Sequence, residues 1–199
     1  MDKALRILQV NTSDGPGGAE AVSRRLWGAY LRLGHRSWLA VGRSRGPEDG
    51  IFVIPDDARG SRWSRLLSRA ARAWERSRGW EDFHHPGTWK LPDLPPEPPD
   101  VIHCHNLHGS YFDLRALPRM SARFPVFLTL HDAWLLSGHC AHSLDCERWK
   151  TGCGLCPDLS LYPAVQRDAT AFNWRRKRAL YERSRLHVAA PSRWLMDKV

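Results

Sequence analysis

Residues 5–20 read LRILQVNTSDGPGGAE. Residues 5–11 are mostly apolar and lead into a glycine-rich turn, which is the pattern of a buried β-strand that ends at a loop. A helical pattern follows from Gly17 to Leu33, and Gly34 is placed to end that helix. A strand, a turn and a helix in this order predict the start of a parallel α/β sheet.

Strand and helix patterns alternate along the rest of the chain. Further strands are predicted at 35–43, 50–56, 101–106, 125–132 and 186–192, and further helices at 61–78, 114–123, 164–185 and from Arg193 onward. Residues 91–100 hold five prolines and predict an extended loop. The fold class expected for residues 1–199 is α/β, as one Rossmann-like, doubly wound parallel sheet without internal repeats.

The composition limits the classes of function. No run approaches the roughly 20 apolar residues of a membrane-spanning helix, and residues 1–11 show no signal-peptide pattern, so a cytoplasmic location is expected. The formal net charge of +9 suggests anionic partners, namely phosphates, nucleic acid or a phospholipid surface. A solvated basic face is the simpler alternative.

Much of this charge lies in the predicted helix 61–78. One face of the helix is apolar, and five arginines lie largely off it; the apolar residues are Trp63, Leu66, Leu67, Ala70 and Trp74, and the arginines are Arg62, Arg65, Arg69, Arg72 and Arg76. This pattern fits a peripheral contact with an anionic membrane surface. The alternative is that the apolar face packs on the sheet.

Ligands of open α/β sheets bind beyond the carboxyl ends of the strands. The turn Asn11–Glu20 lies there, and its amides and the helix that follows favour an anion. It matches neither a dinucleotide fingerprint nor a P-loop, and a tight turn with no ligand stays an alternative. Two further strand ends supply His103, His105, Asn106, His108, His131 and Asp132, which predict a polar cleft. Carboxylates are too sparse there to predict a catalytic metal.

Four cysteines cluster after the fifth predicted strand, at Cys140, Cys146, Cys153 and Cys156. Their spacing suggests a structural zinc site in a Cys-rich loop insertion over 137–160, where His139 or His142 could replace a cysteine. Reduced cysteines in a packed loop and disulfides are the alternatives. A zinc site would hold residues 131–134 at the rim of the cleft, so the cluster is interpreted as a staple next to the chemistry.

Four motifs together resemble a known family: NTSDGPGGAE, VIHCHNLHG, LTLHDAWLLSGHCAHSLDCERWKTGCGLCP and VAAPSRWL. The chain resembles the N-terminal, acceptor-side domain of bacterial retaining GT-B glycosyltransferases of family 4, of the type that builds capsular, colanic-acid-like or other exopolysaccharides. The resemblance covers all 199 residues. It implies the N-terminal half of a GT-B fold, with the nucleotide-sugar-binding domain and its E-x7-E signature beyond residue 199.

The resemblance also implies roles for residues. Gly17 and Gly18 would approach the donor phosphate and sugar, His131 would act at the transferring sugar, and four residues would serve the acceptor side: Asn106, His108, Glu20 and Asp132. Such enzymes need no divalent metal for the chemistry. The partners implied are a nucleotide-sugar donor and a saccharide or polyprenyl-diphosphate-linked saccharide acceptor at the inner face of the cell membrane.

Two other functions stay open. A saccharide-binding remnant without activity is one, because residues 1–199 lack a donor site and are expected to show no turnover alone. A basic zinc protein that binds nucleic acid is the other; no nucleic-acid-binding motif supports it, and no nucleic-acid partner is expected.

Overall fold

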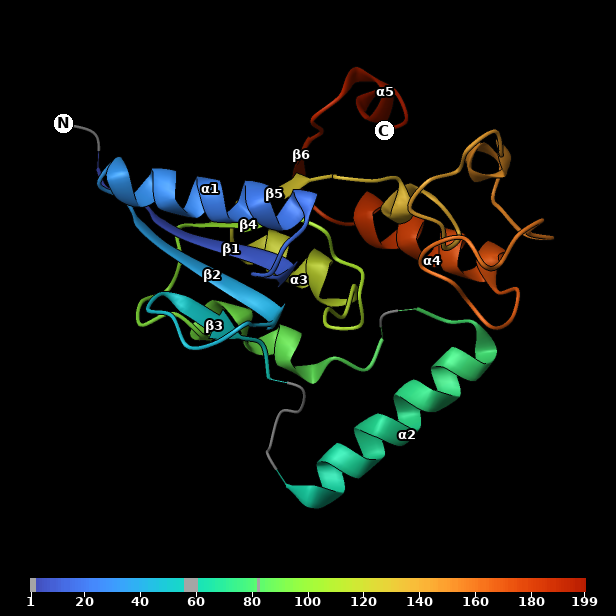
Figure 1. Ribbon diagram of the computed structural model, residues 1–199, viewed down its shortest axis with the longest axis horizontal. Helices are drawn as coiled ribbons and strands as arrows, with labels where there is room; N and C mark the ends of the chain where they lie inside the picture. Colours follow the sequence, from blue (N-terminus) through green and yellow to red (C-terminus); the bar gives the residue numbers. More distant parts are fainter. Residues whose placement is uncertain (1–2, 56–60, 82) are drawn as a thin grey trace.

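The computed structural model describes residues 3–55, 61–81 and 83–199 (Figure 1). Its centre is a six-stranded, entirely parallel sheet with the order β3-β2-β1-β4-β5-β6. The strands are β1 (Arg6–Ser13), β2 (Arg36–Arg43), β3 (Ile51–Val53), β4 (Val101–Cys104), β5 (Val126–Thr129) and β6 (Leu186–Ala189). This strand order is that of Rossmann-like, doubly wound sheets. The predicted fold class is confirmed.

The core forms because the central strands are buried on both faces. In β1, six consecutive residues from Ile7 to Thr12 are buried, as expected of a parallel sheet covered by helices. Helix α1 (Gly18–Arg32) packs along β1 and β2, and α3 (Ala116–Arg123) contacts α4 (Thr170–Glu182).

Strands β4, β5 and β6 end two or three residues before their predicted ends, and three further elements also differ from the prediction. Strand β3 is shorter than predicted, and Asp56 lies outside the described residues. The helix predicted over 164–185 begins only at Thr170, because the Asp168 carboxylate accepts hydrogen bonds from Thr170 N (3.0 Å) and Oγ1 (2.6 Å) and holds a turn just before the helix. Residues 91–93 are not extended but close a 3₁₀ helix, η1 (Pro86–Asp93).

Helix α2 (Arg62–Arg78) extends away from the sheet in Figure 1. Ser61 caps its start, and Gly79, in the left-handed region, ends it. The interpretation in which the apolar face packs on the sheet is wrong, because Trp63 is 76% and Leu67 68% exposed.

The C-terminal end of α2 is attached to the body of the molecule through α4. Trp80 stacks on Phe172 with ring centroids 5.0 Å apart, and Asn173 Nδ2 donates to the Gly79 carbonyl at 2.8 Å. Glu81 pairs with Lys177, whose side chain is completely buried, at 3.2 Å. These contacts fix the end of α2, while its first turns lie free of the sheet.

The Cys-rich segment lies in the long connection between β5 and α4. This connection contains two short 3₁₀ helices, η2 (Trp134–Leu136) and η3 (Arg148–Lys150). After β6 the described chain ends with α5 (Arg193–Met196). Within the described ranges, none of the helices combines the length and the apolar composition that crossing a membrane requires.

Candidate active-site cleft

The strand order reverses direction between β1 and β4, and the predicted site residues gather at the carboxyl ends of β1, β4 and β5. This reversal is the switch point at which doubly wound sheets bind ligands. The loops that follow the three strands therefore form the walls of the candidate site.

The glycine-rich turn is fixed to the neighbouring loop. The Asp14 carboxylate accepts hydrogen bonds from Ser44 Oγ (2.8 Å) and from the Arg45 amide (2.9 Å), so the turns after β1 and β2 are joined. The first turn of α1 follows at Gly18. A Cβ atom on Gly17 would overlap the Glu20 carboxylate, whereas one on Gly18 would meet no atom within 4 Å. Gly17 thus leaves room for Glu20, and Gly18 leaves open space.

A row of three imidazoles extends from β4 to the loop after β5. The rings of His103 and His105 stack at 4.4 Å, and those of His105 and His131 at 5.3 Å. His105 is 1% exposed, and its ring nitrogens lie 3.0 Å from Gln9 Oε1 and 3.0 Å from His131 Nε2. His103 is anchored separately, 2.8 Å from Thr129 Oγ1. The buried ring of His105 therefore positions His131.

Burial keeps this row neutral. Burial, and to a smaller extent the positive charge of the neighbouring His131, lowers the pKa of His103 to about 4. Burial, His103 and His131 lower the pKa of His105 further below its usual range. Burial also lowers the pKa of His131, although the charges of Asp132 and Glu20 oppose that shift. At neutral pH the three rings act as polar, uncharged groups.

His108 and Asp132 join the loops after β4 and β5. His108 Nε2 lies 2.9 Å from Asp132 Oδ2, and Asp132 Oδ1 accepts from the Trp134 amide at 2.9 Å. Burial favours a higher pKa for Asp132, but the hydrogen bond from His108, its charge and the Trp134 amide together leave the pKa below its usual value. Thr12 Oγ1 donates to the His108 carbonyl at 3.0 Å, which connects β1 to the same wall.

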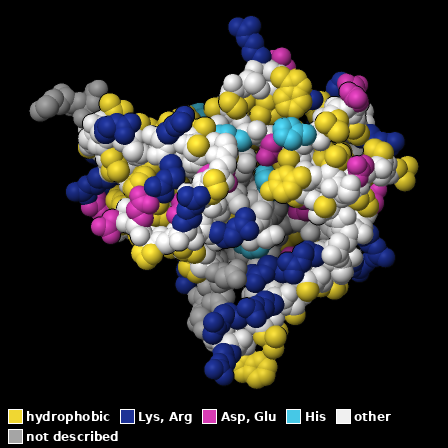
Figure 2. All heavy atoms as spheres, viewed as in Figure 1, with side chains coloured by type: hydrophobic (Ala, Val, Ile, Leu, Met, Phe, Trp, Pro, Cys, Tyr) yellow, Lys and Arg dark blue, Asp and Glu magenta, His cyan; other side chains and the backbone are white. Residues whose placement is uncertain are grey.

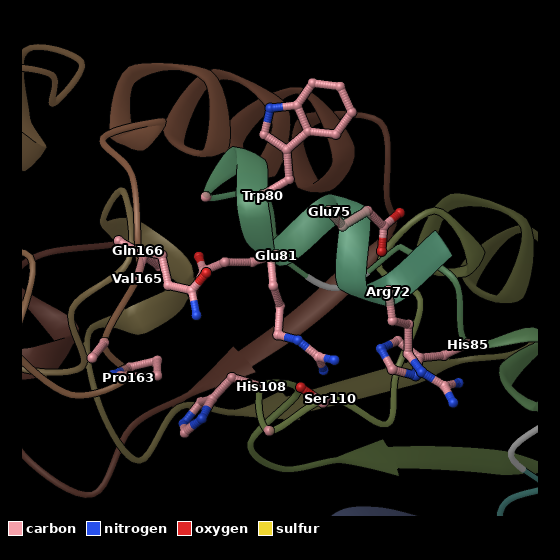
Figure 3. Close-up of a pocket in the computed structure, with 14 residues that line it drawn as sticks. Arg72, Glu75, Trp80, Glu81, His85, His108, Ser110, Pro163, Val165 and Gln166 are labelled. Atoms are coloured by element: carbon pink, nitrogen blue, oxygen red, sulfur yellow. The ribbon is translucent and has the colours of Figure 1, made fainter. Parts of the chain in front are cut away.

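A cavity of about 180 Å³ opens beside His108. Figure 3 shows that side chains from three segments surround it: the end of α2, the loop after β4 and residues 163–166. Arg72, Arg76 and His85 lie on the side of α2, and His108 and Ser110 belong to the sheet side. Glu75 and Glu81 also line the cavity, bonded to His84 and Lys177 respectively, so the cavity combines two arginines, two paired carboxylates and the polar rim of the cleft.

The structure brings most of the predicted site residues together. His131 lies close enough to Glu20 and Asp132 for both charges to affect its pKa, and Glu20 lies against Gly17. Asn106 is on the same loop as His108, and its carbonyl accepts from the Tyr111 hydroxyl. Whether these residues act on substrate stays a prediction.

Sequence reasoning missed two groups of residues at this site. One is Gln9, a polar residue in the middle of the apolar strand β1; this break in the apolar run was the available signal. The other is Arg72 and Arg76, for which the sequence shows a helix but not its position beside His108.

The four clustered cysteines line one small cavity together with His139. All five cysteines of the chain are described and each is free, so no disulfide joins them. His139 Nδ1 bonds to the Pro163 carbonyl at 2.9 Å, and its Nε2 lies 3.4 Å from Cys156 Sγ. In the part of the chain that the structure describes, no three His, Cys, Asp or Glu side chains are arranged so that they could hold a metal ion. The zinc site stays a prediction.

Comparison with known proteins places the chain among sugar transferases. The sequence profile described as Glycosyltransferase Family 4 matches residues 16–199. The Escherichia coli (strain K12) protein named "Putative colanic acid biosynthesis glycosyl transferase WcaC" is 29% identical over 171 residues, which cover 82% of this chain and 42% of that protein. The chain therefore spans less than half the length of this relative.

Proposed function

Because the chain belongs to glycosyltransferase family 4, we propose that it forms the acceptor-side domain of a retaining hexosyltransferase that builds an exopolysaccharide or another cell-surface polysaccharide. The similarity to a protein named for colanic acid biosynthesis supports this class of product. The donor is a nucleotide-sugar, and the acceptor is a saccharide or a polyprenyl-diphosphate-linked saccharide. The enzyme works in the cytoplasm, at the inner face of the cell membrane.

The observation that supports this function best is the position of His131. Its neutral ring stands at the switch point of the sheet, backed by His105 and close to Glu20 and Asp132. When the bond from the sugar to the nucleoside diphosphate breaks, positive charge develops at the anomeric carbon and negative charge on the phosphate. Fixed dipoles and carboxylates around the sugar stabilise this separation more than they stabilise the bound substrate. His131 is the residue proposed to contact the transferring sugar.

The donor phosphate has a matching place at the glycine-rich turn. Backbone amides at Gly17 and Gly18 begin α1, where the helix dipole favours an anion. The open space beside Gly18 allows a sugar or a phosphate to approach the backbone. A second domain supplies the remaining contacts to the nucleotide, and no step of the chemistry requires a metal ion.

The acceptor is proposed to occupy the cavity beside His108. His108 lines this cavity and also a small neighbouring pocket that Asn106 and Asp132 line, so an acceptor bound at His108 would lie beside the loop that carries His131. Arg72 and Arg76 on the opposite wall fit an acceptor that carries phosphate groups.

Transfer is tested with the full-length protein, a panel of labelled nucleotide-sugars and membrane extract as the source of acceptor. Labelled product is expected from one donor, with the anomeric configuration of the donor retained. Residues 1–199 alone are expected to give no product. Saccharide binding by the full-length protein without turnover on any donor would favour the non-catalytic alternative.

A further inference from the structure

Helix α2 exposes two faces of different chemistry. Trp63, Leu66 and Leu67 are 76%, 56% and 68% exposed and share one apolar face. Arginines occupy the opposite side of the helix, and dark blue side chains follow α2 along the lower part of Figure 2. Large apolar side chains that gather on one exposed face mark a surface that binds a partner.

The charges of α2 indicate what kind of partner fits. The helix contains six arginines and one acidic residue, Glu75, which is buried and bonds to His84. Near the free end of the helix, a shallow hollow of about 320 Å³ lies among Arg62, Arg65, Leu66 and Arg69. Three guanidinium groups around one hollow, next to an apolar edge, suit a phosphate group attached to a hydrocarbon chain.

We propose that α2 docks on the surface of a bilayer that contains anionic phospholipids. Trp63, Leu66 and Leu67 insert at the boundary of the acyl chains, and the arginines contact headgroup phosphates while their aliphatic stems lie along the interface. The helix has the length, the basic face and the aromatic residue of a helix that lies in the interfacial plane.

Two other occupants fit this surface less well. A second copy of the chain could cover the apolar face but would leave the row of arginines on the opposite side without a partner, and a net charge of +9 opposes self-association. A nucleic acid would pair with the arginines but leave the three large apolar side chains in water. A bilayer can bury the apolar face among its acyl chains and pair the arginines with its headgroup phosphates.

The docked helix would also orient the molecule. The residues of α2 that line the cavity beside His108, namely Arg72, Glu75 and Arg76, lie at the attached end of the same helix. An interfacial α2 therefore brings the entrance of that cavity toward the headgroups. This inference goes beyond glycosyl transfer and does not depend on it.

Flotation with vesicles tests the proposal on the full-length protein. Vesicles of phosphatidylcholine alone are compared with vesicles of equal parts phosphatidylcholine and phosphatidylglycerol. The wild type is expected to float with the anionic vesicles only. The double variant Arg62→Glu/Arg69→Glu should lower the partition coefficient at least about tenfold, whereas Arg25→Glu/Arg32→Glu reverses two exposed charges on α1 and should bind as the wild type does.

A second variant, Trp63→Ser/Leu67→Ser, tests insertion separately from charge. It is expected to bind at low salt and to be released by salt that leaves the wild type bound. The proposal is overturned if the wild type does not bind anionic vesicles or binds neutral vesicles equally well. It is also overturned if the α1 and α2 charge-reversal variants lose binding to the same extent. Dimers that depend on Trp63 and form without lipid, or tighter binding to duplex DNA than to vesicles, would also overturn it. None of these outcomes reports on transfer, which the product assay measures.

Discussion

His131 Nε2 lies 3.0 Å from Nδ1 of His105, and this contact determines which nitrogen of His131 carries its proton. The other nitrogen of His105, Nε2, faces Gln9 Oε1 at 3.0 Å. With the Gln9 amide oriented so that its oxygen, which only accepts, faces His105, that ring donates through Nε2 and accepts through Nδ1. Neutral His131 must then donate from Nε2, which leaves the lone pair on its Nδ1 as an acceptor for a substrate hydroxyl.

Replacing His131 by alanine is expected to lower turnover by at least about 100-fold, because the transition state loses a fixed polar group. Thermal unfolding should change little, since the ring of His131 is only partly buried. The control is His187→Ala, which removes an exposed imidazole from β6. Product formation by the full-length enzyme is the measurement, and equal rates for the two variants would remove His131 from the site.

Alanine at Gly17 and at Gly18 should have different effects. The new methyl group at residue 17 displaces the Glu20 carboxylate, so kcat should fall because Glu20 acts close to His131. At residue 18 the methyl group meets no protein atom, so any effect must come from the donor and should be seen as a higher KM for the nucleotide-sugar. Steady-state kinetics on both variants separate the two cases. A lower kcat with unchanged KM for Gly18→Ala would contradict the donor assignment.

The depressed pKa of His103 predicts a stability that falls in acid. Between about pH 6.5, the ordinary histidine pKa, and about pH 4 the unfolded chain binds a proton that the native His103 does not. The free energy of unfolding therefore rises with pH across this window, by on the order of 3 kcal/mol from His103. His105 contributes in the same direction.

Urea unfolding at several pH values checks this dependence. His103→Gln keeps a hydrogen-bonding group beside Thr129 but does not titrate, so its stability should depend less steeply on pH than that of the wild type. An unchanged slope would show that His103 is not the group responsible.

The pair Glu81–Lys177 is expected to stabilise the attachment of α2. Lys177 Nζ is buried between Glu81 Oε2 (3.2 Å), the Trp134 carbonyl (2.8 Å) and the Trp134 ring (3.8 Å to its centroid). Glu81→Ala leaves the buried ammonium group without its counter-charge and should cost about 3 kcal/mol. Glu81→Leu/Lys177→Met removes both charges and should cost less. Denaturant midpoints measure both, and a double variant less stable than Glu81→Ala would contradict this account.

Zinc bound to the cysteine cluster can be tested by metal analysis of the purified protein. The prediction is one zinc ion per chain, which requires the four sulfurs to turn toward the cavity that they line. Cys153→Ser/Cys156→Ser should lose the metal and lower the melting temperature. Cys104→Ala, in the buried strand β4, should lose stability but keep the metal. Protein free of metal, in which all five thiols of residues 1–199 react after unfolding, would identify the cluster as reduced cysteines.

The sequence was sufficient to predict the sheet because its signal is local. The apolar runs that became β1 and β2 and the helix between them were evident from spacing alone. The start of α4 was not, since the hydrogen bond from Thr170 N to the Asp168 carboxylate forms a turn where the helical pattern of the sequence continues. The sequence indicated the histidines at the strand ends but not their hydrogen bonds. The partner of His105, Gln9, lies 96 positions away in the chain. The exposure of the apolar face of α2 depends on where the helix lies relative to the sheet. The spacing of residues within the helix carries no information about that position.

The bonds from Thr12 to His108 and from His108 to Asp132 cross-brace one wall of the acceptor cavity. The opposite wall comes from the end of α2 and residues 163–166, which that bracing does not include. In the proposed function, the residues at the transferring sugar and the residues that select the acceptor therefore lie on separate parts of the molecule. Redesign of acceptor preference can begin with Arg72, Arg76 and Gln166, because changes there leave the framework around His131 intact.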